Sequence, residues 1–266
     1  MFHYSIILTD PLSSFGSETE LRNRFISAKE CGFEGVELGL NEPLGINLDH
    51  IEQWLTDLGL VVPALLTGEA YSKENCLSSP DGSVRKRAVE QLIRYLDVSG
   101  QFNAILVIGL LQGLRSDEPN EQLAKRRIVD SLREVAAAAE QKGVEFVIEP
   151  VNHLQVGFNH TVSEVLALIR EINSPAAKPM VDTIHLNIEE TSLTGPIHDC
   201  GSELRHVHLC ESNGSLLGTG HINFGEVLST LAEIRYEEFV SVKVYRGCPF
   251  EQAARSSMEF LNALDR

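Results

Sequence analysis

Basic residues are scarce in this sequence. Its 266 residues include 22 lysines and arginines against 38 aspartates and glutamates, which gives a formal net charge of −16. An acidic surface repels the phosphate backbones of DNA and RNA. We therefore expect no nucleic-acid partner.

The sequence also lacks any apolar run long enough to cross a bilayer. Met1 leads almost directly into the short apolar stretch YSIIL, without the basic region, long apolar segment and cleavage site of a signal peptide. We expect a cytoplasmic protein that does not associate with membranes.

Cysteines are few, and none forms a CxxC pair. Their odd number and scattered positions argue against a disulfide framework or a structural zinc knuckle, and predict reduced thiols. The five cysteines are Cys31, Cys76, Cys200, Cys210 and Cys248. Three nucleotide and nucleophile motifs are absent as well: a GxGxxG after the first apolar run, a phosphate-binding P-loop and a GxSxG elbow.

Short apolar runs alternate with longer amphipathic stretches along the whole chain. Helical patterns end at Gly32 and Gly143, and another begins at Thr161 with Glu164 three residues on, the pattern of a capping box. Strands are predicted at residues 4–8, 35–39, 61–66, 104–109, 145–149, 179–182, 205–209 and 239–244. This alternation predicts an α/β protein with a single (β/α)8 TIM barrel domain over residues 1–266, and a doubly wound open sheet is the structural alternative.

Side chains on a barrel strand alternate between the helix-facing side and the barrel interior. In each predicted strand the apolar residues fit the outer face, so the polar ones fall on the inner face. The inward polar set includes Glu37, Glu149, Asp182, His206, His208 and Lys243. Four of these, Glu149, Asp182, His208 and Lys243, fall at the carboxyl ends of strands five to eight, where barrel active sites form.

Two carboxylates and an imidazole at one end of a barrel predict a divalent-metal site formed by Glu149, Asp182 and His208. A polar network that merely fixes the packing of the barrel is the alternative. A single such residue at a strand end favours packing, whereas three ligand-type residues in phase on adjacent strands favour a site.

Several of these strand ends resemble the xylose-isomerase-like barrels, in particular ketose 3-epimerases of the D-tagatose/D-psicose kind and sugar-phosphate isomerases and epimerases. The resemblance covers essentially the whole chain. It is carried by VIEPVNH (147–153), MVDTIHLNIEE (180–190), HVHLCESNG (206–214), GTGHINFGEV (218–227) and YEEFVSVKVY (236–245).

The resemblance implies a divalent metal (manganese, magnesium, cobalt or zinc) whose first three ligands match Glu149, Asp182 and His208. It further implies that two glutamates exchange a proton with the sugar through an enediolate, with Glu149 as one of them. His185 matches the substrate-binding histidine, and Glu211 stands where the family has an acidic residue near the site. The implied partner is a small sugar or sugar phosphate, and the implied assembly is a homodimer or homotetramer.

The sequence departs from the family at the pocket. Lys243 stands at the position of the second catalytic glutamate. The family often has arginine where His153 stands, glutamate where Gln155 stands and arginine where Gly214 stands. These changes indicate a different ligand, a different reaction or no reaction.

Three charge states of Lys243 remain open. Its ammonium can occupy the cation position without a metal, paired with Glu149 and Asp182; a metal can bind while the lysine is displaced; or a neutral lysine beside a metal can act as the second base. In a further alternative, the long side chain extends to the solvent at the barrel rim.

We expect a sugar isomerase or epimerase with an altered active site, in which Glu149 and Lys243 are the catalytic candidates. His185, Glu211 and His153 are the substrate-binding candidates. Arg115 and Arg246 follow strands four and eight, where they could clamp a phosphate or carboxylate, although surface arginines are the alternative. Whether the protein is an enzyme stays open, because a non-catalytic carbohydrate-binding or regulatory barrel and a lyase or dehydratase fit the same sequence.

Overall fold

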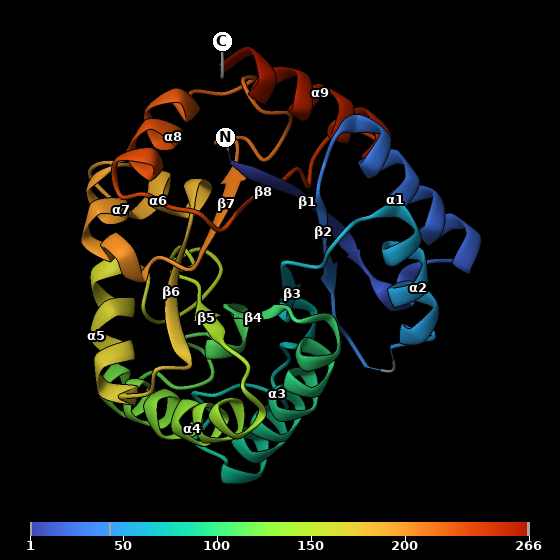
Figure 1. Ribbon diagram of the computed structural model, residues 1–266. Helices are drawn as coiled ribbons and strands as arrows, with labels where there is room; N and C mark the ends of the chain where they lie inside the picture. The colour runs from blue at the N-terminus through green and yellow to red at the C-terminus, as the bar shows by residue number, and fades with distance from the viewer. Residues whose placement is uncertain (1, 43, 265–266) are drawn as a thin grey trace.

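The computed structural model describes residues 2–42 and 44–264, and its strands form a closed parallel barrel in chain order (Figure 1). The first strand closes the barrel by pairing with the last, in register from His3 opposite Phe239 to Ile6 opposite Val242. The strands are β1 (His3–Pro11), β2 (Gly35–Gly39), β3 (Ala64–Leu66), β4 (Ile105–Ile108), β5 (Phe146–Ile148), β6 (Ala177–Asp182), β7 (His206–Cys210) and β8 (Phe239–Lys243).

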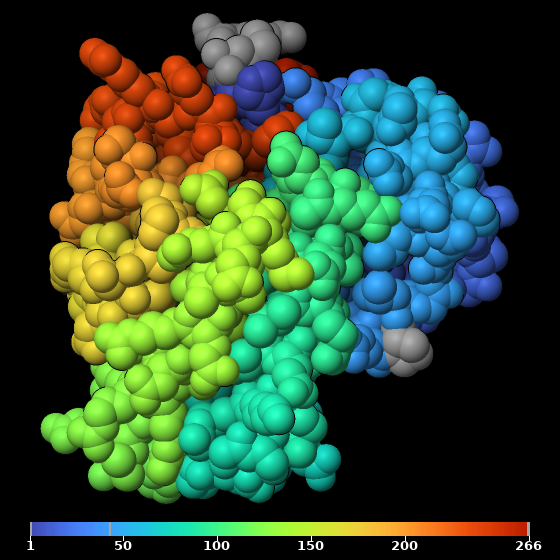
Figure 2. Space-filling model, turned by 60° about the horizontal axis from the view of Figure 1, so that its bottom comes forward, coloured from blue at the N-terminus to red at the C-terminus, as the bar shows by residue number. Residues whose placement is uncertain are grey.

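Helices follow the strands and surround the barrel (Figure 1). Segments that are adjacent in sequence also lie side by side on the surface, as the order of colours in Figure 2 shows. The α-helices are α1 (Glu18–Cys31), α2 (Leu48–Leu58), α3 (Gly82–Phe102), α4 (Glu121–Lys142), α5 (Val162–Ile172), α6 (Thr183–Glu189), α7 (Gly195–Cys200), α8 (Phe224–Glu233) and α9 (Phe250–Leu264). Short 3-10 turns lie at Leu12–Ser14, Gly68–Ala70, Leu110–Gln112 and Gly201–Glu203.

The predicted (β/α)8 barrel is confirmed, and each predicted strand range overlaps one observed strand. The open-sheet alternative is excluded by the pairing of β1 with β8. That residues 1–266 form a single domain stays a prediction, and residues 1, 43, 265 and 266 of that range lie outside the described residues.

Local sequence signals set the ends of the helices. α1 ends before Gly32, whose φ of +100° places it in the left-handed region while its N–H donates to the carbonyls of Ala28 and Lys29. α5 begins at the predicted capping box, in which Thr161 accepts from the N–H of Glu164 and the Glu164 carboxylate accepts from that of Thr161.

The apolar core divides into two parts, as the alternation of barrel strands requires. A large cluster packs the outer face of the strands against the helices. A small cluster belongs to the inner face of β3 to β6, and it consists of Ala64, Ile105, Val107, Val147 and Met180 with Leu66 against it. The inner face of the other strands is therefore left for polar side chains.

All five cysteines are free thiols, as predicted. Within the described ranges, no helix has both the length and the apolar character needed to cross a membrane.

The capping box of α5 gives a first test. Replacing Thr161 by alanine removes the acceptor for the N–H of Glu164, and should lower the free energy of unfolding by about 1 kcal/mol. Urea unfolding measures the change, with the exposed Thr56→Ala of α2 as the control. Equal losses in the two variants would mean that the capping box contributes nothing.

Candidate active site

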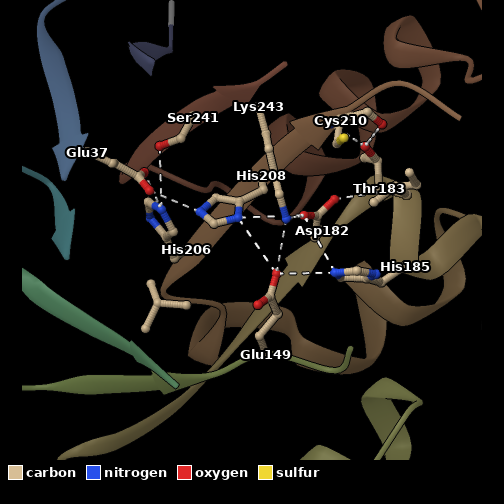
Figure 3. A network of polar contacts seen from close by, with 12 residues as sticks. Glu37, Glu149, Asp182, Thr183, His185, His206, His208, Cys210, Ser241 and Lys243 are labelled. Carbon is tan, nitrogen blue, oxygen red and sulfur yellow. Dashed lines mark hydrogen bonds and ion pairs between the residues drawn. The ribbon is translucent and has the colours of Figure 1, made fainter. Parts of the chain in front are cut away.

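The carboxyl ends of four successive strands bring four charged or ligand-type side chains together at the mouth of the barrel (Figure 3). Glu149 follows β5, Asp182 ends β6, His208 lies in β7 and Lys243 ends β8. One atom from each of Glu149, Asp182 and His208 lies within 4.8 Å of the others. The three predicted metal ligands are thus close enough to share one ion.

Lys243 extends into the middle of this cluster. Its Nζ lies 2.7 Å from Asp182 Oδ2 and 3.8 Å from Glu149 Oε1 (Figure 3). Its side chain is 23% exposed. The ammonium therefore meets the two carboxylates that strand phase predicts, and the alternative in which it extends to solvent at the rim is wrong.

The charges in the cluster stabilise one another. Burial alone would raise the pKa of Glu149, but the Lys243 ammonium and His185 outweigh it and lower that pKa to about 2. Burial is outweighed at Asp182 too, because Lys243 and His185 hold its pKa well below the usual range. Burial would in turn lower the pKa of Lys243, whereas Asp182 and Glu149 raise it. Without a metal ion, Lys243 is therefore an ammonium at neutral pH, and the neutral lysine beside a bound metal stays a prediction.

A second buried cluster lies directly beside the first. Glu37, fully buried in β2, accepts from two rings of β7: its Oε1 lies 2.7 Å from Nε2 of His206 and its Oε2 lies 3.1 Å from Nε2 of His208. Burial would lower the pKa of His208, but Glu37 and Asp182 raise it to about 9. The phase of the strands placed Glu37 and His206 inward, but sequence reasoning gave neither a role.

Two buried atoms of the cluster have no hydrogen-bond partner: Glu149 Oε1 and His208 Nδ1. They lie 3.8 Å apart, and the same nitrogen lies 3.6 Å from Asp182 Oδ2. Because Glu37 takes the Nε2 side of His208, the Nδ1 side is the one that faces the carboxylates. Once His208 has lost its Nδ1 proton, these two oxygens and the nitrogen fit a divalent cation. Lys243 reaches the same two oxygens.

His185 and Asn152 form one side of the cluster. The Asn152 side chain donates from Nδ2 to His185 Nδ1 over 2.7 Å, and its Oδ1 accepts from the N–H of Leu154. This pairing leaves the proton of His185 on Nε2, which lies 3.5 Å from Glu149 Oε1. Sequence reasoning found His185 through the resemblance but missed Asn152, whose role depends on a contact across 33 residues.

The position of Glu149 depends on neighbours that carry no charge. A Cβ at Gly109 would lie 2.6 Å from Glu149 Oε2, so the glycine leaves the space that the carboxylate needs. Buried Gln112 donates to the carbonyl of Glu149 and accepts from Asn159. These residues were not predicted, and nothing in their local sequence indicates them.

The cluster forms one end of a cavity of about 260 Å³. Polar groups gather at this end, while the other walls are mainly aliphatic. The lining residues are Leu66, Thr67, Gly68, Val107, Gly109, Leu110, Glu149, Val151, Gln155, Ile184, His185, His208, Lys243 and Tyr245. A cavity of this size accommodates one small molecule rather than a polymer.

Four predicted substrate-binding residues do not line this cavity: Glu211, His153, Arg115 and Arg246. Arg115 is half exposed and pairs with Glu121 at 3.0 Å, and Arg246 is exposed. His153 is also more than half exposed, and its Nδ1 lies 2.5 Å from Glu189 Oε1. Their contact with substrate stays a prediction.

Glu211 organises the loop after β7. Its Oε1 accepts from the N–H and hydroxyl of Ser212 and from the N–H of Ile222, and its Oε2 accepts from the N–H of Gly218. Both oxygens are thus occupied by donors of the same loop. The structure therefore gives Glu211 a role in loop geometry, and its contact with substrate also stays a prediction.

Tyr245 occupies the space next to Gly214. Gly214 has a φ of +71°, and a Cβ there would overlap the Tyr245 ring. The N–H of Tyr245 also donates to the Gly214 carbonyl at 3.1 Å. The arginine that the resemblance implies at position 214 would therefore displace the tyrosine, which itself lines the cavity.

Comparisons with known proteins agree with this geometry. Residues 25–264 match the family model of the xylose isomerase-like TIM barrel. A ketose 3-epimerase of Arthrobacter globiformis is 30% identical over 211 residues, which cover 79% of this chain and 72% of that protein. An L-ribulose 3-epimerase of Mesorhizobium japonicum is 28% identical over 236 residues, which cover 88% of this chain and 78% of that protein.

A solved structure shares the same fold. The D-psicose 3-epimerase of Clostridium cellulolyticum H10, solved with D-tagatose, superposes with a TM-score of 0.86 at 24% identity. The superposition covers 99% of this chain and 98% of the other.

The contacts of Glu37 can be tested through stability. Glutamine at position 37 can accept from one histidine but presents its amide N–H to the other, so one buried ring loses its acceptor. We expect Glu37→Gln to lower the free energy of unfolding by about 3 kcal/mol. Urea unfolding measures the change in the free energy of unfolding. The control is Glu34→Gln at a half-exposed position, where the free energy of unfolding should change by no more than about 0.5 kcal/mol. A Glu37→Gln variant as stable as the parent would show that the two contacts contribute no net stability.

Proposed function

The chain belongs to the xylose isomerase-like TIM barrel family, and on that premise we propose that it is a sugar isomerase or epimerase that moves a proton on the carbon next to a carbonyl group. The observation that carries the proposal is Glu149: its carboxylate lines the cavity, stays ionised with a pKa of about 2, and has one oxygen without a hydrogen-bond partner. That oxygen is available to accept a proton from a bound substrate.

In the proposed reaction, Glu149 takes the proton from the carbon beside the carbonyl. The electron pair of the C–H bond moves toward the carbonyl oxygen and forms an enediolate, and Glu149 then returns the proton. A carboxylate with so low a pKa is a weak base, so the reaction needs positive charge beside the carbonyl oxygen to acidify the C–H bond. Lys243 and the Nε2 proton of His185 both lie within 4 Å of the Glu149 carboxylate, where they can supply it.

Glu149, Asp182 and His208 are the residues that would hold a divalent cation such as Mn²⁺, Mg²⁺, Co²⁺ or Zn²⁺. When bound, the ion supplies Lewis-acid polarisation of the carbonyl and hydroxyl oxygens. The two unpartnered atoms, Glu149 Oε1 and His208 Nδ1, support this ligand set.

The proposed substrate is a small ketose without a phosphate group. The cavity volume of about 260 Å³ suits a monosaccharide. No arginine is among the described residues that line it, and the two predicted clamp residues, Arg115 and Arg246, do not line it. Assembly into a dimer or tetramer and a cytoplasmic location stay predictions.

Lys243 supports a second candidate function, a barrel that binds carbohydrate without converting it. Inverting a carbon centre requires proton removal on one face and proton delivery on the other, and the described cavity lining offers one carboxylate, Glu149. A single carboxylate can return a proton to the same face or to the neighbouring carbon, which fits exchange and aldose–ketose isomerisation better than inversion.

Proton exchange with the solvent tests the proposal directly. The protein is incubated in D2O with L-ribulose and with D-psicose, the ketoses in the names of two of the similar proteins, and NMR follows deuterium uptake and product formation. We expect uptake at the carbon beside the carbonyl. Glu149→Gln should reduce its rate at least about 100-fold, because it removes the proton acceptor. The control is Glu145→Gln, just before β5. The Glu145 carboxylate pairs with Arg205 outside the cavity, so this change should leave the exchange rate unaltered.

Two outcomes contradict the proposal. Equal rates in the parent protein and Glu149→Gln would remove Glu149 from the chemistry. Saturable binding of a ketose without any exchange would favour the carbohydrate-binding barrel.

A further inference from the structure

We propose that the Lys243 ammonium is the resident cation of the Glu149–Asp182–His208 triad, and that a divalent ion enters this triad only by displacing the lysine. The inference rests on the proposed use of that triad as a cation site, and it names what the site holds at rest. It assigns to a side chain of the protein the charge that a metal ion would otherwise supply.

The first argument is that the lysine and an ion compete for the same atoms. Lys243 Nζ lies 2.7 Å from Asp182 Oδ2, the oxygen that also lies 3.6 Å from His208 Nδ1. Its second contact is Glu149 Oε1 at 3.8 Å, the unpartnered oxygen of the cluster. An ion at the usual ligand distance of about 2.0–2.2 Å from these oxygens could not coexist with the ammonium.

The second argument is electrostatic. Asp182 is fully buried and the Glu149 side chain is 11% exposed, so two neighbouring carboxylates are removed from water. Such a pair is unfavourable without compensating positive charge. Among the described lysines and arginines, Lys243 is the one that forms ion pairs with these carboxylates. The folded chain therefore supplies the positive charge that these two carboxylates need from one of its own side chains.

The third argument concerns where the lysine would go. The cavity beyond the cluster is walled by Leu66, Val107, Leu110, Val151 and Ile184. Glu149 is the one carboxylate among its described lining residues. A displaced ammonium would lose Asp182 and enter a mainly aliphatic space whose other polar side chains, Thr67, Gln155 and Tyr245, carry no negative charge. An entering ion must therefore compensate for that loss as well as for its own dehydration.

The placement also suits the proposed reaction. When Glu149 takes the proton from the sugar carbon, negative charge develops on the carbonyl oxygen. An ammonium held beside Glu149 can donate a hydrogen bond to that oxygen and keep its own proton, and Glu149 then returns the proton it took. Atoms and charge balance without an added ion.

Metal affinity tests the proposal without relying on activity. The parent protein, Lys243→Met and Lys243→Glu are freed of metal with a chelator and titrated with Mn²⁺, and the free ion is measured by electron paramagnetic resonance. Methionine removes the positive charge at similar length, so we expect Mn²⁺ to bind at least about ten-fold more tightly than to the parent protein, and glutamate should tighten it further by adding a fourth ligand. Lys178→Met, which removes a lysine that pairs with Glu203 at the surface, is the matched control and should bind like the parent.

Thermal unfolding gives an independent measurement. Without metal, Lys243→Met removes the ammonium that lies against both buried carboxylates and should lower Tm, and Mn²⁺ should restore the Tm because the ion binds the folded state. The Tm of the parent protein should not respond to the same Mn²⁺ concentration. If Lys243→Met does not fold without metal, Lys243→Gln provides the comparison, because its neutral amide can still donate a hydrogen bond to Asp182.

Equal Mn²⁺ affinity in the parent protein and both Lys243 variants would overturn the proposal. So would a rise in the Tm of the parent as large as that of the variants. Failure of the proposed function is a separate result: if no ketose exchanges deuterium but the affinities follow the expected order, Lys243 is the resident cation of a barrel that does not catalyse this reaction.

Discussion

The mouth of this barrel depends on one electrostatic constraint, the proximity of two buried carboxylates, Glu149 and Asp182. Glu149 follows β5 and Asp182 ends the neighbouring β6, and both side chains are largely removed from solvent. The fold satisfies the constraint with Lys243 from β8, which lies 2.7 Å from Asp182 and 3.8 Å from Glu149. The same ion pairs keep Glu149 ionised, which allows it to accept a proton, and make it a weak base, which leaves the proposed reaction dependent on nearby positive charge.

Glu37 supplies the hydrogen-bond acceptor for two buried histidines beside the first cluster. It accepts from His206 and His208, so both rings of β7 are fixed through their Nε2 atoms. Ser241 continues the polar contacts to Ser5 across the β1–β8 seam. Polar side chains thus occupy the interior near β7, β8, β1 and β2, whereas β3 to β6 contribute most of the apolar interior. The polar cluster rests on an asymmetric barrel, with an aliphatic wall on one side of the cavity and charged groups on the other.

Strand phase predicted most of the fold and the centre of the site because the alternation of barrel strands has a fixed period. It placed Lys243 inward opposite Glu149 and Asp182, and the capping pattern placed the start of α5 at Thr161. The loops have no such period. Both Glu211 oxygens accept hydrogen bonds because the loop of residues 211–222 folds back on its first residue. Arg115 comes after β4, but it pairs with Glu121 at the surface. Glu37 lay inward as predicted, but its partners are 169 and 171 residues away in sequence. Pattern alone does not specify a contact across that distance.

The resemblance implies a glutamate at position 243, and the lysine found there changes the charge of the whole cluster. A second carboxylate there would add negative charge to the cluster, which would then need a bound cation. The lysine adds positive charge and gives the cluster a cation of its own. An ammonium paired at 2.7 Å with Asp182 can donate hydrogen bonds but has no lone pair with which to accept a proton. Among the described residues that line the cavity, Glu149 is the one carboxylate, so the proposed proton transfer begins and ends there. Proton transfer on a single face of a substrate follows from this arrangement, and inversion would require a donor on the other face that the substrate or a bound water would have to supply.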